Sequence, residues 1–196
     1  MALSNDSMIL DIIKYGHPVL RQKGARVAAI TPPIERLIRD MFETMQSARG
    51  VGLAAQQVGQ ALQLTTIDVR GVTDRPSTLE WNGKPAEVAA FMPMALINPE
   101  IKPYGEPATG PEGCLSFPEI YSDITRPGFV EVTALNAKGE RIQFRCGGLL
   151  SRVVQHEYDH LQGILFIDRM DKAKKAELKP DLDELQAQTK ATLKKK

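Results

Sequence analysis

The sequence predicts an α+β fold, because strand-like segments gather in the middle of the chain and helical segments flank them. The strands do not alternate with helices, as a repeating βαβ sheet requires. The chain has 196 residues, enough for one compact domain and too few for two ordinary domains. Hydrophobic residues make up 42% of the chain and charged residues 25%, a composition that argues against global disorder. We therefore expect a single domain over residues 1–171 and a Lys-rich helical tail over residues 172–196.

The N-terminal part of the chain supplies a strand and a helix. Residues 9–16 (ILDIIKYG) are typical of a short strand, and residues 17–20 then form a turn. Thr31 is suited to cap a helix that begins at Pro32. Apolar residues spaced three and four apart then form one buried stripe: Ile34, Leu37, Ile38, Met41, Phe42 and Met45. We expect this helix to end at Gly50.

Strands dominate the middle of the chain. Residues 62–69 and residues 94–98 are strand-like, and Pro99 is expected to stop the second of these strands. Residues 70–93 are rich in proline, glycine and polar groups, which predicts a long loop. Residues 129–146 contain two β-branched and aromatic segments around a Lys-Gly turn, a pattern typical of an antiparallel hairpin.

A second helix is predicted over residues 149–162, and Gly163 ends it. Its apolar residues are Leu149, Leu150, Val153, Val154 and Leu161. His156 and His160 lie four positions apart on this helix and therefore project from the same face. Both imidazoles can reach one metal ion, although the pair alone is also compatible with a polar helix face.

The two histidines belong to the pattern H-E-x-x-H, in which the second residue lies close to the metal. Glu157 stands at that position and can act on a water at the metal as general base or acid. Asp159 lies between the histidines in the sequence. It can orient an imidazole by accepting its second N–H, or it can be a solvated surface acid.

A catalytic metal normally takes three protein ligands and leaves one position open. One metalloprotease pattern has a third histidine as ligand, but that position is Phe166 in this chain. Another pattern uses a later glutamate, but the later glutamates here lie in a Lys-rich segment. We therefore expect the third ligand to lie upstream of the helix. Cys114 lies in a Gly- and Pro-marked loop that suits a metal-bound thiolate. Cys146 is typical of a small buried hydrophobe at a strand end, and His17 of a loop residue. Two imidazoles and one thiolate suit Fe(II), Zn(II), Co(II) or Ni(II) rather than magnesium or calcium.

A third glycine-rich segment spans residues 50–59 (GVGLAAQQVG). Its spacing fits neither a dinucleotide-binding fingerprint nor a phosphate-binding loop. Its bare glycines and alanines let the backbone approach a ligand or another segment. Gln57 can add an amide donor to a polarised carbonyl oxygen, although a tight loop packed on the core would give the same pattern.

Charge and hydropathy exclude several classes of protein. The formal charge of +1 gives no whole-protein field for nucleic acid. The longest uncharged apolar stretch, residues 88–97, is too short for a transmembrane helix and contains Pro93. The first residues lack a basic segment followed by an apolar one, so we expect no signal peptide. Two cysteines rule out a disulfide scaffold and fit a reducing cytoplasm, where we expect the protein to act.

Three segments together resemble the signature segments of the peptide deformylase family. They are G-x-G-L-A-A-x-Q at residues 50–57, E-G-C-L-S at residues 112–116 and H-E-x-D-H-x-x-G at residues 156–163, in the family's order. The resemblance covers residues 8–170. It implies a deformylase-like domain over residues 1–171, in which antiparallel or mixed sheets pack around a central metal-bearing helix.

The resemblance implies a hydrolase that removes the N-formyl group from the formyl-methionine at the start of new polypeptides, releasing formate. By motif match the metal ligands are Cys114, His156 and His160. Fe(II) is the family's usual metal, with zinc, nickel and cobalt as alternatives. Gln57 and the backbone N–H of Leu115 would stabilise the formyl oxygen, and Glu157 would carry a proton from water to the leaving amine.

Specificity for a formyl group would come from a tight pocket that excludes bulkier acyl groups. Gly52 would let the substrate come close to the backbone. Leu149 and Val153 precede His156 by seven and three residues, so the three share one helical face. We expect the two apolar residues to line the methionine pocket, although plain core residues would give the same spacing.

Two other classes fit parts of the sequence. A metallopeptidase that cuts internal peptide bonds shares the helix pattern. A metal-stabilised binding protein without activity is the third class, and the intact Glu157 and Gln57 argue against it.

The C-terminal tail carries eight lysines against four acidic residues over residues 172–196. It is predicted to form helical pieces, residues 172–179 and 181–196, broken at Pro180. The tail is either a solvated, partly frayed end or a surface that binds ribosomal RNA where formylated chains emerge. We expect a monomer without a membrane anchor.

Overall fold

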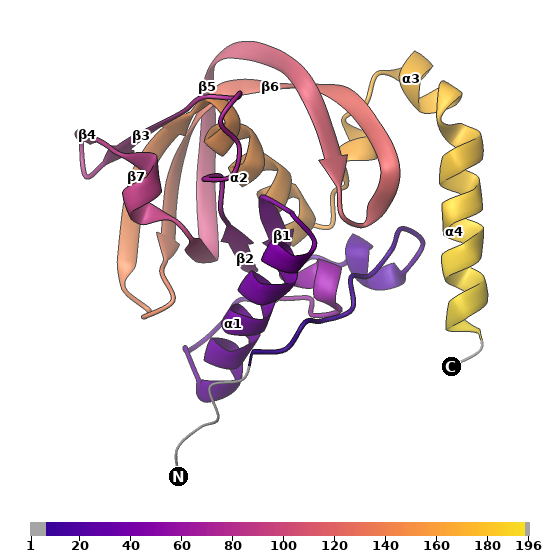
Figure 1. Ribbon diagram of the computed structural model, residues 1–196, viewed down its shortest axis with the longest axis horizontal. Helices are drawn as coiled ribbons and strands as arrows, with labels where there is room; N and C mark the ends of the chain where they lie inside the picture. The colour runs from indigo at the N-terminus through magenta and orange to yellow at the C-terminus, as the bar shows by residue number, and fades with distance from the viewer. Residues whose placement is uncertain (1–6, 195–196) are drawn as a thin grey trace.

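The computed structural model describes residues 7–194 and confirms the α+β architecture (Figure 1). One seven-stranded sheet has the order β1-β2-β5-β6-β7-β3-β4, and each neighbouring pair in it is antiparallel. The strands are β1 (Gly52–Ala54), β2 (Leu64–Ile67), β3 (Ser77–Trp81), β4 (Lys84–Ala86), β5 (Met94–Cys114), β6 (Phe117–Leu135) and β7 (Arg141–Gly147). The α-helices are α1 (Pro32–Ser47), α2 (Gly148–Leu161), α3 (Lys172–Glu177) and α4 (Lys179–Leu193). Short 3-10 helices are η1 (Pro18–Arg21), η2 (Ala55–Val58), η3 (Val88–Phe91) and η4 (Phe166–Asp168).

Helix α2 is the central element, and Figure 1 shows it in the middle of the molecule. It packs against six strands, and all but two of its 14 residues are buried. Apolar side chains of the sheet and of α2 form the main core: Ile67, Leu96, Val130, Val132, Phe144, Leu150 and Val154. The sheet therefore holds α2 on several sides, which fixes the direction of every side chain that α2 carries.

Both long helices follow the sequence prediction. Helix α1 begins at Pro32 after Thr31 and buries its apolar stripe against β1 and β2, although it ends at Ser47, before Gly50. Helix α2 ends before Gly163, whose φ of +74° is the left-handed conformation that glycine adopts at helix ends. A Cβ atom at Gly163 would lie 2.5 Å from the carbonyl oxygen of Arg21, so the position also needs a residue without a side chain.

The strand predicted for residues 9–16 is wrong. The segment is not assigned to the sheet, and its backbone N–H groups find scattered acceptors instead. Leu10 N donates to the Thr44 hydroxyl at 2.8 Å, on helix α1, and Ile13 N donates to the carbonyl of Gln57 at 2.8 Å. Because these acceptors lie on different elements, no continuous ladder forms.

The long loop predicted for residues 70–93 is also wrong, since it contains the hairpin of β3 and β4. Its turn is Asn82-Gly83, with φ of 51° and 79°, the combination that two-residue hairpin turns require. The predicted stop at Pro99 is wrong as well. Strand β5 continues past it through an irregularity between Ile97 and Glu100, which absorbs the missing N–H of the proline.

The hairpin predicted over residues 129–146 is confirmed as the pairing of β6 with β7. The C-terminal tail forms α3 and α4, with Pro180 inside the first turn of α4 rather than at a break. Leu182 is buried against the core, while the rest of α4 is mostly exposed and lies at one edge of the molecule (Figure 1). The expectation of no signal peptide concerns the first residues of the chain, and the predicted tail helix runs to residue 196. Both therefore lie partly outside the described residues 7–194. Within this range, none of the helices combines the length and apolar character that crossing a membrane requires.

Candidate metal centre

Three side chains from two distant parts of the sequence converge beside helix α2. Cys114 is the last residue of β5, and His156 and His160 project from α2. One ligand atom from each of the three lies within 4.8 Å of the others, and Cys114 Sγ lies 3.3 Å from His160 Nε2. The structure therefore brings together the two histidines and the cysteine that the sequence singled out.

The other candidate ligands lie elsewhere. Cys146 is buried in the main core on β7, where burial raises the pKa of its thiol and keeps it protonated. His17 precedes η1, and its Nδ1 accepts a hydrogen bond from Val19 N at 3.1 Å. The interpretations of Cys146 as a core hydrophobe and of His17 as a loop residue are confirmed.

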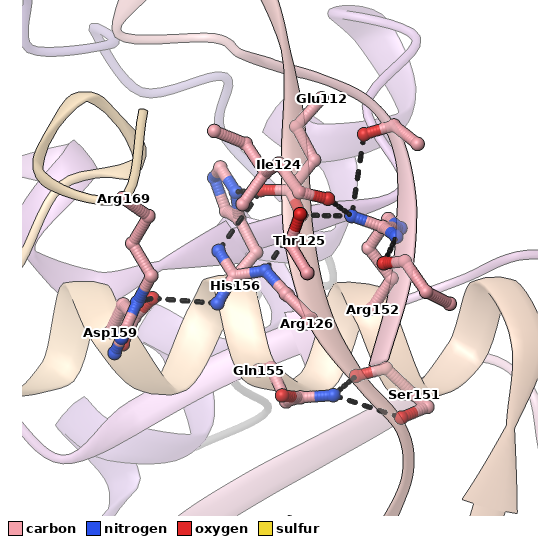
Figure 2. A network of polar contacts seen from close by, with 12 residues as sticks. Glu112, Ile124, Thr125, Arg126, Ser151, Arg152, Gln155, His156, Asp159 and Arg169 are labelled. Atoms are coloured by element: carbon pink, nitrogen blue, oxygen red, sulfur yellow. Dashed lines mark hydrogen bonds and ion pairs between the residues drawn. The ribbon is translucent and has the colours of Figure 1, made fainter. Parts of the chain in front are cut away.

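The carboxylate of Glu112 lies between the His156 ring and the guanidinium of Arg152 (Figure 2). Glu112 Oε2 lies 3.0 Å from His156 Nδ1, and Glu112 Oε1 accepts from Arg126 Nε at 2.6 Å and from Arg152 Nη1 at 2.8 Å. Desolvation alone would raise the pKa of Glu112, but hydrogen bonds from His156 and Arg126 hold this pKa well below its usual range. Because Glu112 is ionised, His156 Nδ1 donates to it, which leaves Nε2 as the nitrogen for a metal.

Asp159 extends this network from Arg126 to Arg169 (Figure 2). Arg126 Nη1 donates to Asp159 Oδ2 at 2.8 Å, and Arg169 donates to both carboxylate oxygens, at 2.8 and 2.6 Å. Asp159 is only 4% exposed, so it is not a surface acid, and its partners among the described residues are guanidinium groups rather than an imidazole. Both sequence interpretations of Asp159 are wrong, since it reaches His156 only through Arg126 and Glu112.

Glu157 lies next to the triad and is buried. Its Oε2 lies 3.4 Å from the Thr65 hydroxyl oxygen, which donates its proton to the Leu53 carbonyl at 2.9 Å. Burial raises the pKa of Glu157 to about 7. A Cβ atom at Gly52 would lie 2.2 Å from Glu157 Oε1, so only glycine at position 52 leaves room for this carboxylate.

The glycine-rich segment brings Gln57 to the same place. Gln57 Oε1 accepts a hydrogen bond from Ala54 N at 2.8 Å, which turns the amide nitrogen of Gln57 toward Cys114. Gln57 Nε2 lies 3.4 Å from Cys114 Sγ and 3.3 Å from the hydroxyl of Ser116. The amide N–H groups of Gln57 therefore point to the space beside the thiol.

A cavity of about 460 Å³ opens at these side chains. Among its lining residues are the predicted site residues Gly52, Gln57, Cys114, Leu115, Leu149, Val153, His156 and Glu157. Leu149 and Val153 are each 6% exposed, and both also belong to the main core cluster. The lining therefore combines two members of the metal-binding triad, Cys114 and His156, with an acid or base and an amide donor. The third member, His160, has its ligand atom within 4.8 Å of theirs but is not among the lining residues.

The chain matches the family described as polypeptide deformylase over residues 9–176. It is 44% identical over 178 residues to a peptide deformylase of Methylacidiphilum infernorum, covering 91% of this chain and 93% of the relative. It is 42% identical over 189 residues to a peptide deformylase of Opitutus terrae, covering 95% of this chain and 98% of the relative.

Solved structures with the same fold carry the same description. The crystal structure of a peptide deformylase from Legionella pneumophila has a TM-score of 0.75 and 34% identity, covering 90% of this chain and 94% of that one. The structure of a peptide deformylase from Synechococcus elongatus, solved in complex with actinonin, has a TM-score of 0.73 and 35% identity. That match covers 96% of this chain and 91% of the other.

Proposed function

The chain belongs to the peptide deformylase family, and from this premise we propose how its own residues carry out the reaction. It is a metal-dependent hydrolase that removes the N-formyl group from nascent peptides. Water adds to the formyl carbon, the bond from that carbon to the methionine nitrogen breaks, and formate and a free amino terminus leave. The site must therefore activate a water, stabilise an oxyanion and protonate a nitrogen.

Cys114, His156 and His160 would hold the metal, and their chemistry fits one. Burial lowers the pKa of His160 well below its ordinary value, so this imidazole is in the neutral form that binds metals. A thiolate with two imidazoles suits Fe(II), zinc, nickel or cobalt, and we propose Fe(II) as the native metal. When bound, such an ion acts as a Lewis acid that brings the pKa of a water close to neutrality. Metal analysis of protein purified without oxygen tests this assignment, and a full complement of another metal would contradict it.

Glu157 would move the proton. Because its pKa is about 7, both the ionised and the protonated carboxyl are populated at neutral pH. The ionised carboxyl can accept a proton from water, and the protonated carboxyl can give it to the leaving nitrogen. Thr65 Oγ1 lies 3.4 Å from Oε2, while Oε1 lies at the space above Gly52.

Gln57 and the backbone N–H of Leu115 would stabilise the negative charge that develops on the formyl oxygen. Gln57 is held by Ala54 so that its amide N–H groups lie beside Cys114. Leu115 directly follows Cys114 in the turn between β5 and β6. One such donor contributes roughly 3 kcal/mol of transition-state stabilisation in hydrolases.

Gly52, Leu149 and Val153 would form the substrate pocket for the backbone and methionine side chain. The substitution Val153→Phe should raise the KM for formyl-methionyl peptides, because the larger ring would fill the cavity. Val154→Phe is the matched control, since Val154 lies in the same core but not in the cavity lining. An equal effect of both variants on KM, or an effect of Val153→Phe on stability alone, would contradict the pocket assignment.

The observation that carries the proposal is the convergence of Cys114, His156 and His160 within 4.8 Å, beside a cavity that Cys114, His156 and Glu157 line. Its test is formate release from formyl-Met-Ala, compared with deacylation of acetyl-Met-Ala and cleavage of an internal peptide bond. We expect rapid release from the formyl substrate alone. Cleavage of the internal bond would instead identify a metallopeptidase, and no reaction at all would identify a binding protein.

We further propose that the protein acts in the cytoplasm as a monomer and that its Lys-rich tail contacts ribosomal RNA. The excess of lysine over residues 172–196 supports that contact, and Lys172, Lys179, Lys190 and Lys194 are exposed. Replacing Lys172, Lys179, Lys190 and Lys194 together by glutamine keeps the buried Leu182 in place. It should leave turnover of a short formyl-peptide unchanged and abolish co-sedimentation with ribosomes at low salt. Equal co-sedimentation of the wild type and this variant would contradict ribosome binding, and sedimentation equilibrium tests the monomer.

A further inference from the structure

The N-terminal segment over residues 13–15 is fastened to both loops that carry the proposed oxyanion donors. Ile13 N donates to the carbonyl of Gln57 at 2.8 Å, on the glycine-rich loop. Lys14 Nζ donates to the carbonyl of Leu115 at 2.7 Å, and Tyr15 N donates to the carbonyl of Ser116 at 2.9 Å. Three consecutive residues therefore hold the two loops in one relative position.

Leu115 and Ser116 form the two-residue turn between β5 and β6, flanked by the paired residues Cys114 and Phe117. In the middle of such a turn, the peptide groups can rotate unless other groups bind them. Here both turn carbonyls accept hydrogen bonds from residues 14 and 15. The carbonyl belongs to the peptide group that follows the Leu115 Cα atom, and the N–H belongs to the group that precedes it. The two planar groups meet at this Cα atom, so anchoring the carbonyl limits how far the N–H can turn.

Lys14 differs from its two neighbours because it reaches the turn with a charged side chain. Its side chain also lines the catalytic cavity, next to Cys114, Leu115 and Gln57. Hydrogen bonds from an ionised donor are roughly twice as strong as neutral ones. The position is half-buried, which reduces competition from water for the Leu115 carbonyl.

We propose that Lys14 is a positioning residue for deformylation, whose ammonium holds the Leu115 carbonyl so that the Leu115 N–H points at the formyl oxygen. The proposal rests on the proposed role of the Leu115 N–H. Because that N–H acts mainly on the developing oxyanion, its misplacement lowers kcat more than it raises KM. Small displacements of catalytic groups have large effects on rate, so we expect a loss of about 10- to 100-fold in kcat.

The experiment compares Lys14→Met, Lys14→Arg and the wild-type protein, each loaded with the same metal. Lys138→Met is the matched control, since Lys138 is exposed in the turn between β6 and β7. For each protein we would measure kcat and KM for formyl-Met-Ala, bound metal per chain and the melting temperature. Lys14→Met should lose kcat with KM within about twofold of wild type and unchanged metal content, and Lys14→Arg should restore most of kcat because arginine also donates to a carbonyl.

Three results would overturn the proposal: an unchanged kcat in Lys14→Met, a change confined to KM, or a fall in metal content that accounts for the lost turnover. A Lys14→Arg protein that folds and is as slow as Lys14→Met would also overturn it. The wild-type protein separates this proposal from the proposed function. If the metal-loaded wild type releases no formate, the function itself fails, whereas an active wild type with an equally active Lys14→Met refutes only the role of Lys14.

Discussion

Arg126 is the side chain whose removal should disturb both the stability of the fold and the affinity for the metal. It is 3% exposed and joins two buried carboxylates, with hydrogen bonds of 2.6 and 3.0 Å to Glu112 and 2.8 Å to Asp159. The substitution Arg126→Met keeps much of the volume and removes all three bonds. Removing one partner of a buried ion pair costs about 3–5 kcal/mol.

The lower end of that range applies here, because both carboxylates keep another cationic partner. Glu112 retains Arg152 and Asp159 retains Arg169. A loss of about 3 kcal/mol in a chain of this size lowers the melting temperature by about 6–12 °C. Since Glu112 accepts the Nδ1 proton of His156, we also expect metal affinity to fall about 10- to 100-fold.

The assay follows urea unfolding by fluorescence of the single tryptophan, Trp81, which stacks between Phe91 and Phe144. Metal affinity is measured by competition with a chelator of known strength. Arg145→Met is the matched control, because Arg145 is exposed and pairs with Glu131 at 2.7 Å on the surface. We expect the control to lose less than about 1 kcal/mol. If Arg126→Met and Arg145→Met change stability and metal affinity equally, the reasoning about the buried network is refuted.

The remaining predictions concern the triad, the proton carrier and a surface ion pair. Glu157→Gln should keep its metal but lose at least about 100-fold in turnover, and near-normal turnover of a metal-loaded variant would contradict this. Cys114→Ser should lose metal while Cys146→Ser keeps it, and the opposite metal contents would show that Cys146 is the ligand. Peroxide should inactivate the iron-loaded wild type through oxidation of Cys114. Burial alone would raise the pKa of Asp168, but the hydrogen bond from Arg21 holds this pKa below its ordinary value. The ion pair therefore stabilises the fold fully above about pH 4, and this stabilisation is lost as the pH falls through the lowered pKa. The stability difference between wild type and Arg21→Met should therefore shrink on acidification below that pH, and a difference that is independent of pH would show that the ion pair contributes nothing.

The elements that the sequence predicts well are those whose pattern is local and long. Helix α2 is predicted over residues 149–162 and observed over Gly148–Leu161, because its apolar spacing is regular and glycines bound it. The helical repeat alone places His156 and His160 on the same face of α2. Recognition of three segments in order then places Cys114 beside them, a contact that spans 46 residues in the sequence.

Short and irregular strands escape prediction for identifiable reasons. The hairpin of β3 and β4 lies in a Pro- and Gly-rich stretch, and its one clear signal is the Asn82-Gly83 turn. Residues 9–16 carry strand-like side chains, but a strand also needs a partner edge, and here the backbone instead bonds to α1 and two loops. Whether such a partner exists depends on tertiary packing rather than on local composition.

The charges around the triad are the part of the site that the sequence analysis missed. Arg126 precedes a proline and has the sequence context of a surface turn, yet it is buried between two carboxylates. The bond from Lys14 to Leu115 joins residues 101 positions apart, and no local pattern predicts it. Single charged residues in a sequence are ordinarily solvated, so only the fold reveals which of them face one another.

The central claim is that one metal ion, held by Cys114, His156 and His160, makes this chain a deformylase. The most direct measurement is a titration of metal-free protein with Fe(II) in the absence of oxygen, with formate release from formyl-Met-Ala recorded at each addition. We predict that activity rises in proportion to added metal and reaches its maximum at one ion per chain. Formate release that is independent of added metal, or no release at one bound ion per chain, would contradict the claim.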